Sequence, residues 1–369
     1  MTDHRVGISF VGDVALAMRI HEVLDRTRFR IRFYSGPKSR LRRSRFVDEF
    51  ISVGANKTPT VKEVVDAAQT GLVVADDWMA YSTDQMLFGL RQALPHHPHL
   101  APLVPVGKEK YWHMLGSKIG LAEVLEELEL PTPPTRVAHT ETELREVLAR
   151  LEKPALIKGE QGGGGFQVKR VEPGEKPQVP DSWFPVIVQD FVEGALISVE
   201  AVFRHGDLVS WQYSRAVSTA MEFGWTTVRD FIEPPRLDAL ETLRTLGEKA
   251  GLHGFANCSF IWDEAKNEHL LFEVDLRANR WHHMAPKLGI NLSARMTGDE
   301  ILPITESGSQ HHGNIHLFSR HIEQALKTRN YKSLRPWLRR EPGTWEWRCH
   351  ADSAVTWREM KALLRALFP

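Results

Sequence analysis

A run of glycines follows a lysine near the middle of the chain, in the segment Lys158-Gly-Glu-Gln-Gly-Gly-Gly-Gly. Gly162, Gly163, Gly164 and Gly165 carry no side chains, so the backbone there can fold over an anion and present its amide N–H groups. No Gly-Lys-Ser/Thr ends the run, and a strand-like segment follows it, so neither the Walker loop nor the dinucleotide fingerprint applies. The run predicts a mobile flap over phosphates, with an ordinary flexible loop as the alternative.

Two lysines are placed where their charge could reach the same phosphates. Lys158 ends an apolar strand-like segment, 154–158, whose alternation points its side chain away from that of Ile157. An ammonium there can meet phosphate oxygens just ahead of the glycines. Lys118 stands near the start of a predicted helix. Taken singly, each lysine is also typical of a solvated surface charge, so the prediction depends on what accompanies them.

Three charged residues recur with a period of two near the end of a predicted strand. Glu273, Asp275 and Arg277 alternate with Val274 and Leu276, so they share one face. Paired carboxylates suit Mg²⁺, a hard cation that commonly links protein carboxylates to nucleotide phosphates. An arginine beside them can neutralise charge on a phosphoryl group. The motif predicts a magnesium and phosphate site, with a half-buried strand and a solvated charged face as the alternative.

The elements that must position these residues begin with alternating strands and helices. Strands are predicted at 6–11, 29–34 and 71–75, and helices after Gly12 and at 61–68. This alternation indicates an α/β domain. Asp76 and Asp77 follow the third strand, and the carboxyl ends of parallel strands face the ligand crevice, so both could point at a substrate. Plain turn residues are the alternative.

Strands dominate the prediction after a proline-rich connector. A helix at 117–130 ends at Leu130-Pro-Thr-Pro-Pro, because three prolines in four residues cannot continue it. Thr140 and Glu143 form a capping box that starts a helix to about residue 151. Further strands are predicted at 154–158, 166–171, 186–191, 196–203, 208–217, 254–262 and 269–276, with one helix at 237–250.

The totals limit the classes of protein that the chain can represent. Its 369 residues exceed what one core usually serves, so two or three domains are expected. The 47 Lys and Arg residues equal the 47 Asp and Glu residues, so no overall field favours nucleic acid or a membrane as partner. Two cysteines, no secretory signal and no apolar stretch of ~20 residues favour the reducing cytoplasm.

The order of these motifs resembles the ATP-grasp superfamily over roughly residues 5–298. The resemblance runs from Lys118 through the proline connector, Lys158 and the glycines, then the segment 186–194, and ends at Glu273-Val-Asp-Leu-Arg. It implies an α/β and α+β chain, in which a Rossmann-like domain precedes two lobes that close on ATP. The expected divisions are 1–110 for the Rossmann-like domain, 111–190 for the small lobe with the flap, 191–310 for the large lobe with the metal site, and 311–369 for a C-terminal helical and loop extension.

The resemblance also assigns contacts to the nucleotide. Such proteins usually direct a glutamate of the segment 186–194 toward the adenine amino group. The matching residue here is Gln189, whose amide oxygen can accept the same hydrogen bond. The backbone around Val192 would contact the adenine edge. Leu196 replaces a glutamate that usually binds the ribose, which leaves Glu193 or Glu200 as its substitute.

The metal site departs from the family pattern at one position. The strand 257–262 commonly supplies the first metal carboxylate in such proteins, but this chain has Ser259 there. Metal binding then depends on Glu273 and Asp275. Asp275 stands where many relatives have asparagine, and this could restore the missing negative charge. ATP and Mg²⁺ are the implied cofactors.

The resemblance implies a ligase in which a carboxylate attacks the γ-phosphate and an amine then attacks the acyl phosphate. Lys118 and Lys158 would hold the phosphates, and Arg277 would stabilise the transferred phosphoryl group. Arg215, on a strand expected to line the same cleft, is a second candidate ligand. The expected partners are a small-molecule carboxylate and an amine, such as an amino acid or a related metabolite. The oligomeric state stays open, a homodimer included.

Two other interpretations stay open. A ligase that activates bicarbonate would use the same machinery to make carboxyphosphate. A nucleotide-binding regulator without turnover would fit the departures at Ser259 and Leu196. Substrate contacts are expected from the segment 218–227, which combines Trp, Phe and Glu, and from the residues after the metal strand: Asn279, Arg280 and His282, for which a helix-start role is the alternative.

Overall fold

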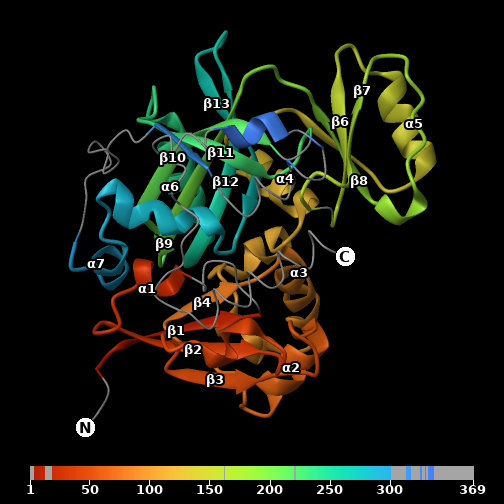
Figure 1. Cartoon of the computed structure of the whole chain (residues 1–369). Coiled ribbons are helices and arrows are strands. Elements are labelled where there is room, and N and C mark those ends of the chain that lie inside the picture. Colours follow the sequence, from red (N-terminus) through yellow and green to blue (C-terminus); the bar gives the residue numbers. More distant parts are fainter. Residues whose placement is uncertain are drawn as a thin grey trace.

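The computed structural model describes residues 4–12, 19–161, 163–219, 222–300, 313–316, 325, 329 and 331–335. Within these residues the chain forms three separate β-sheets, and Figure 1 shows them as three distinct parts of the molecule. The first sheet is parallel and the other two are antiparallel. The mixed α/β and α+β class expected from the sequence is therefore confirmed.

The first sheet has four parallel strands with helical segments on both faces. Its order is β3 (Glu49–Ser52), β2 (Phe29–Ser35), β1 (Val6–Val11) and β4 (Trp78–Tyr81). One face packs against α2 (Val61–Gln69) and α3 (Asp84–Ala93), and the other against α1 (Ile20–Val23) and the 3₁₀ segment η6 (Arg280–Leu288). Burial on both faces explains why β1 is apolar at nearly every position.

The prediction of a strand at 71–75 was wrong. These residues have no regular strand structure, and β4 begins only at Trp78. Asp76 and Asp77 therefore precede a strand and lie at the amino end of the sheet. The Asp77 carboxylate accepts a hydrogen bond from the Gly7 amide (2.8 Å), and Asp76 accepts one from the Ser9 hydroxyl (2.5 Å). Both carboxylates hold the first sheet together and do not face its ligand edge.

The second sheet is a small antiparallel unit with its own core. Its order is β5 (Thr135–Ala138), β8 (Val186–Asp190), β6 (Ala155–Gly159) and β7 (Val168–Val171). Helix α5 (Glu141–Ala149) packs on it through Leu144 and Leu148, which contact Ile157 and Val188 in a separate apolar cluster. Thr140 caps this helix by accepting from the Glu143 amide (3.2 Å), but the Glu143 carboxylate accepts from the His139 amide (2.8 Å) and not from that of Thr140, so only half of the predicted capping box forms.

The third sheet has six antiparallel strands. Its order is β13 (Glu268–Asp275), β12 (Gly254–Asp263), β9 (Ala195–Arg204), β10 (Asp207–Thr219), β11 (Thr226–Phe231) and β14 (Gly313–His316). Helix α6 (Asp238–Ala250) covers one face, and the short helix α7 (Leu292–Thr297) follows η6. Strand β14 belongs to the segment assigned to a C-terminal extension, most of which lies outside the described residues.

Two apolar clusters join the first and third sheets. The larger contains Tyr81 of β4, Leu87 of α3, Val124 of α4 (Lys118–Glu127) and Val199 of β9. The other contains Phe10 of β1 and Phe255 of β12. The second sheet contributes nothing to either cluster. Figure 1 shows α3 and α4 between the parallel sheet and the two antiparallel sheets. These two helices thus connect all three parts of the fold.

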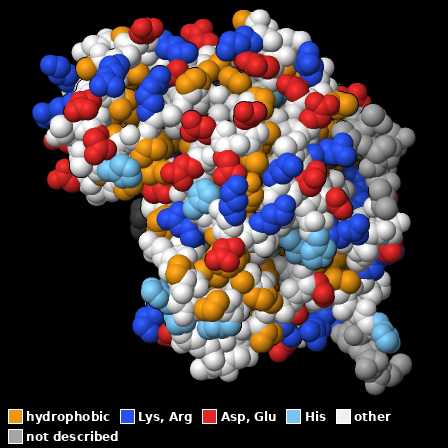
Figure 2. Space-filling view, turned by 180° about the vertical axis from the view of Figure 1, so that it is seen from behind, with side chains coloured by type: hydrophobic (Ala, Val, Ile, Leu, Met, Phe, Trp, Pro, Cys, Tyr) orange, Lys and Arg blue, Asp and Glu red, His pale blue; other side chains and the backbone are white. Residues whose placement is uncertain are grey.

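Neither positive nor negative side chains dominate the surface shown in Figure 2. Figure 2 shows acidic and basic side chains interspersed over this face. This agrees with the equal numbers of acidic and basic residues in the sequence. Among the described residues no helix is long and apolar enough to cross a membrane.

Candidate functional site

Lys158 is a buried cation on β6. Its side chain is only 7% exposed, and its ammonium donates a hydrogen bond to the side-chain oxygen of Gln189 on the neighbouring strand β8 (2.7 Å). The ammonium also lies 4.6 Å from the ring centre of Phe272 on β13. Burial lowers the pKa of Lys158 to about 8; Glu273 opposes the shift and Lys118 adds to it. Lys158 therefore connects the second sheet to β13 of the third sheet.

Lys118 is the first residue of α4. The N-terminal end of this helix is hydrogen-bonded to Glu160, which lies just before the flap glycines. Ser117 caps α4 by accepting from the Gly120 amide (2.9 Å). The Glu160 carboxylate accepts from the Ser117 hydroxyl (2.5 Å) and from the Ile119 amide (3.0 Å). The Lys118 ammonium donates to the main-chain oxygen of Glu160 (3.4 Å). Glu160 was not predicted from the sequence, although it stands just before the glycine run.

The glycines after Glu160 face the third sheet. Gly162 lies outside the described residues, but Gly164 and Gly165 have φ angles of +65° and +82°, which glycine adopts without strain. A Cβ on Gly165 would lie 2.5 Å from the main-chain oxygen of Phe223, and one on Gly164 would lie 3.2 Å from the Trp225 ring. The flap is therefore packed on residues 223–225, between β10 and β11, in close main-chain contact.

Glu273 and Asp275 lie on one face of β13, as the spacing predicts. Their partners on β12 are Ser259 and Asn257, respectively. Burial raises the pKa of Asp275 well above its ordinary value; repulsion from Asp84 and Glu273 adds to this, and Arg277 opposes it. Among the described residues no group of three or more His, Cys, Asp or Glu side chains could hold a metal. Two crowded carboxylates still fit Mg²⁺, which commonly takes one or two carboxylates and completes its shell with phosphates and water.

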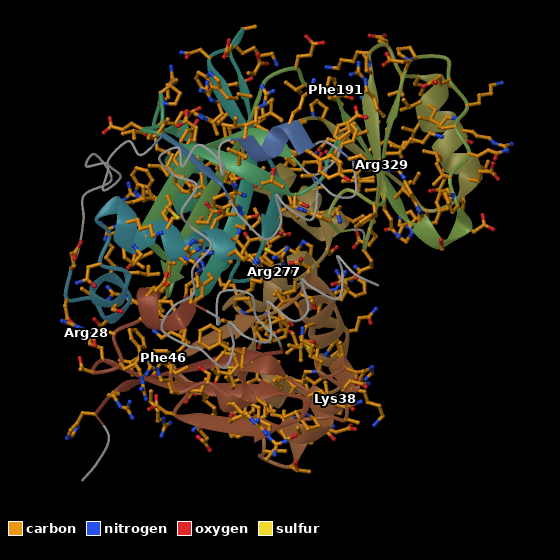
Figure 3. All side chains as sticks on the ribbon, in the orientation of Figure 1. Arg28, Lys38, Phe46, Phe191, Arg277 and Arg329 are labelled. Carbon is orange, nitrogen blue, oxygen red and sulfur yellow. The ribbon has the colours of Figure 1, made fainter. Side chains whose placement is uncertain are left out.

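Arg277 lies between two carboxylates from distant parts of the chain. Its Nε donates to Asp84 of α3 (2.7 Å) and its Nη2 donates to Asp275 (2.6 Å). Burial alone would lower the pKa of Arg277, but Asp275 and Asp84 outweigh burial and raise it. Figure 3 shows Arg277 near the centre of the molecule, where the N-terminal part meets the six-stranded sheet. Asp84 was not predicted from the sequence.

A buried polar group lies two strands from β13, on β9. The Glu200 carboxylate of β9 is fully buried, and one oxygen accepts from Arg229 (2.5 Å), Asn257 (2.8 Å) and Asn279 (3.1 Å). Arg229 lies 4.6 Å from the ring centre of Trp281. Glu200 is thus a buried ion-pair residue.

The other candidate for the ribose, Glu193, is exposed. It lies in the irregular connection 191–194, which also contains Val192.

The residues after β13 begin a helical segment. Asn279 precedes η6, and its side-chain oxygen accepts from the Trp281 amide (2.9 Å). His282 is fully buried, which lowers its pKa. Its ring contacts the main-chain oxygen of Ala201 (3.3 Å). The helix-start role considered for these residues is therefore the one seen.

Arg215 is not brought together with the other candidates, contrary to the expectation of a shared cleft. Paired residues of an antiparallel sheet share a face. Ser214 pairs with Ser198, and Ser198 pairs with Ser259 on the face of Glu273. Arg215, the next residue on β10, therefore lies on the opposite face. It is half exposed there and forms an ion pair with Asp230 of β11 (3.3 Å).

Residues 115–267 match the model of a protein family described as the ATP-grasp domain. Comparison with curated protein sequences gives no match. The chain has the ATP-grasp fold, and residues 115–267 carry the match to the ATP-grasp domain.

Three solved structures illustrate this fold. N5-carboxyaminoimidazole synthetase from Staphylococcus aureus has a TM-score of 0.61 and 12% identity, over 98% of this chain and 97% of that one. The L-amino acid ligase from Bacillus licheniformis has a TM-score of 0.57 and 15% identity, over 85% and 79%. The biotin carboxylase domain of the Hydrogenobacter thermophilus 2-oxoglutarate carboxylase, solved with MgADP, ADP and bicarbonate, has a TM-score of 0.58 and 14% identity, over 84% and 74%. At these identities the similarity carries the fold alone.

Proposed function

We propose that the protein is an ATP-dependent, ADP-forming ligase that activates a carboxylate as an acyl phosphate and joins it to an amine. One observation carries the proposal: charged groups from three separate elements act on one another inside an ATP-grasp fold. Lys158 interacts electrostatically with Lys118 and Glu273, and Asp275 interacts with Lys118 and Arg277. A cluster that mixes cations with paired carboxylates beside a glycine flap suits a nucleotide triphosphate and its metal.

In the first step a carboxylate oxygen attacks the γ-phosphorus in line. An O–P bond forms to the acid, the bond between the γ-phosphorus and the β,γ-bridging oxygen breaks, and ADP leaves with the electron pair. Lys118 and Lys158 would hold the phosphate oxygens, and Arg277 would neutralise charge on the transferred group. Gln189, Val192 and Glu193 would contact the adenosine part. These roles require positioning and charge, which buried and hydrogen-bonded cations supply.

In the second step the amine nitrogen attacks the carbonyl carbon of the acyl phosphate. A C–N bond forms, the C–O bond to phosphate breaks, and the amine proton leaves with the departing phosphate or to solvent. Water must be excluded between the two steps, because the acyl phosphate hydrolyses. The flap described above, packed on residues 223–225, is suited to this shielding.

Mg²⁺ would be held by Glu273 and Asp275, and when bound it neutralises charge on the β- and γ-phosphates. The crowding of Asp275 by Glu273 and Asp84 supports this assignment, because a divalent cation offsets the repulsion that raises the pKa of Asp275. Ser259 pairs with Glu273 where the family commonly has a carboxylate, so these two acids must suffice.

A second candidate is a ligase that activates bicarbonate. The N5-carboxyaminoimidazole synthetase fold covers 98% of this chain, and the biotin carboxylase domain was solved with bicarbonate bound. The amino-acid alternative has the L-amino acid ligase as its structural neighbour. The three neighbours have similar TM-scores, so the substrate must be decided by assay.

The deciding experiment measures ADP release with MgATP and pools of amino acids, and separately with bicarbonate and candidate amines. ADP formation that requires two amino acids supports the proposed ligase, and formation that requires bicarbonate supports the second candidate. Lys158→Ala is the control that must abolish either signal. Tight ATP binding with no ADP formed from any pool would instead favour a nucleotide-binding regulator.

A further inference from the structure

The first turn of α3, in the N-terminal part, touches the candidate site. Thr83 caps the helix by accepting from the Met86 amide (3.2 Å), so Asp84 is its first residue. This turn follows β4 directly and lies at the carboxyl edge of the parallel sheet. The Asp84 carboxylate accepts a hydrogen bond from Nε of Arg277 (2.7 Å), a residue 193 positions later in the chain.

The same turn also contacts the residue before the flap glycines and the segment before Lys118. The Gln85 side chain donates to the main-chain oxygen of Gln161 (3.4 Å), and the Gln161 side chain donates to the main-chain oxygen of Gly116 (3.3 Å). A Cβ on Gly116 would lie 2.3 Å from the main-chain oxygen of Asp84. One helical turn therefore contacts the ends of three elements that carry the proposed phosphate ligands.

The geometry of Arg277 shows what Asp84 contributes. The guanidinium is a rigid plane, so two hydrogen bonds to fixed acceptors determine its orientation. Asp275 supplies one acceptor, but it lies two residues away on the same segment and is itself a proposed metal ligand. Asp84 supplies the other from a different part of the fold. Without Asp84, Arg277 would keep its positive charge. Among the described residues, it would lose the hydrogen bond that holds its side chain to a part of the fold other than β13 and the residues next to β13.

We propose that Asp84 is a positioning residue for phosphoryl transfer, which holds Arg277 in the orientation that stabilises the transferred group. The first turn of α3 then makes the N-terminal part of the chain a component of the catalytic assembly. This inference rests on the proposed function for the role of Arg277. The contacts that carry it do not depend on the identity of the acid or the amine.

A double-mutant cycle tests whether Asp84 acts through Arg277. Asp84→Asn should lower kcat for ADP formation by about 10- to 100-fold, because a small misplacement of a catalytic group costs about that much. Asp84→Glu should recover part of the loss. In an Arg277→Ala background Asp84→Asn should have no further effect, whereas losses that multiply would overturn the proposal. Asp66→Asn, on an exposed acidic residue of α2, is the matched control and should leave kcat unchanged.

A binding experiment separates this inference from the proposed function. Calorimetry compares MgADP alone with MgADP plus aluminium fluoride, which mimics the transferred phosphoryl group. Asp84→Asn should weaken binding of the mimic complex by about tenfold and leave the affinity for MgADP within about twofold. If the unaltered protein binds MgADP with and without aluminium fluoride, and Asp84→Asn binds each with the same affinity as the unaltered protein, the positioning role is refuted and the proposed function is not. If the unaltered protein does not bind MgADP, the proposed function fails.

Discussion

The ammonium of Lys158 lies 2.7 Å from the side-chain oxygen of Gln189, so a cation expected at phosphate and an acceptor expected at adenine are bonded to each other. The Gln189 nitrogen donates to the Thr135 hydroxyl (3.0 Å), which turns the amide oxygen toward Lys158. Both side chains are buried on adjacent strands. The pair therefore fixes the position of a charge at the base of the flap.

Nucleotide binding should weaken as the pH rises through the pKa of Lys158, which burial lowers to about 8. The neutral amine no longer attracts phosphate, so kcat/KM for ATP should fall by about tenfold per pH unit above that value. The measurement is a pH profile of kcat/KM between about pH 6.5 and 9.5. Lys158→Arg stays charged and should remove this limb of the profile. An alkaline limb unchanged in that variant would contradict the assignment.

The same shift predicts a dependence of stability on pH. The pKa of Lys158 is lower in the folded chain than in the unfolded chain, so the unfolded chain binds more protons between about pH 8 and 10.5. Lys158→Met should therefore be more stable than the unaltered protein at pH 7, by up to about 3 kcal/mol. The difference should shrink as the pH rises through this window. Urea unfolding at pH 7 and pH 10 measures it, and a constant difference would contradict the prediction.

The loss of kcat should be much larger for Arg277→Ala than for Arg215→Ala. Arg277→Ala removes the guanidinium beside Asp275 and should lower kcat by about 100- to 1000-fold. Arg215→Ala breaks an exposed pair with Asp230 on the other face of the sheet and should change kcat by less than about twofold. Steady-state ADP release measures both, and a large loss in Arg215→Ala would restore it to the site.

The flap glycines should not be equivalent. Gly165→Ala places a Cβ 2.5 Å from the main-chain oxygen of Phe223 at a φ of +82°, so the flap must leave residues 223–225. We expect a higher KM for ATP and more hydrolysis of ATP without product, because water reaches the intermediate. Gly163→Ala is the matched comparison, since a Cβ there meets nothing within 4 Å. ADP formed per product formed is the measurement, and equal ratios in the two variants would contradict the packing role.

Asp275→Asn should raise the Mg²⁺ concentration for half-maximal activity by about tenfold, because only Glu273 would then carry a metal charge. Ser259 pairs with Glu273 on β12, so Ser259→Asp in the same variant should recover much of the lost affinity. Magnesium titrations of ADP release give both values. An unchanged magnesium requirement in Asp275→Asn would show that the extra carboxylate does not compensate for Ser259.

Glu200→Ala should be among the most destabilising changes in the six-stranded sheet. It leaves the Arg229 guanidinium buried without its carboxylate, at a cost of about 3–5 kcal/mol. Glu141→Ala breaks an exposed i,i+4 pair with Arg145 and should cost less than about 0.5 kcal/mol. Urea unfolding of both variants provides the comparison. Similar losses would mean that the buried pair contributes no more than the exposed one.

Much of the fold could be predicted because most elements have local signals. Apolar runs and helical spacing gave β1, α2 and α6 to within a residue or two. Helix α3 was missed, although Thr83 is an N-cap residue. Gly89 in its interior lowers helix propensity, and the structure shows why a glycine is there: a Cβ would lie 2.4 Å from the Val61 side chain of α2.

The candidate site was predictable where its residues share one segment. Glu273, Asp275 and Arg277 follow from a period of two, and Lys158 follows from its position before the glycines. Asp84 is 193 residues from Arg277, so no local pattern links them. Arg215 was misplaced because the face of a strand residue depends on the pairing register across three strands, which spacing on one strand does not reveal.

The apolar clusters that join the parallel sheet to the six-stranded sheet have a mechanical consequence. Separating these two sheets would expose Leu87, Val124 and Val199 to water, which the hydrophobic effect opposes. The small sheet keeps its own core, so moving it against the rest of the fold would leave these contacts intact. Residues 130–134 and 191–194, which have no regular structure, join it to the neighbouring elements. We therefore expect opening and closing to move the small sheet against a fixed body that contains Asp84 and Arg277.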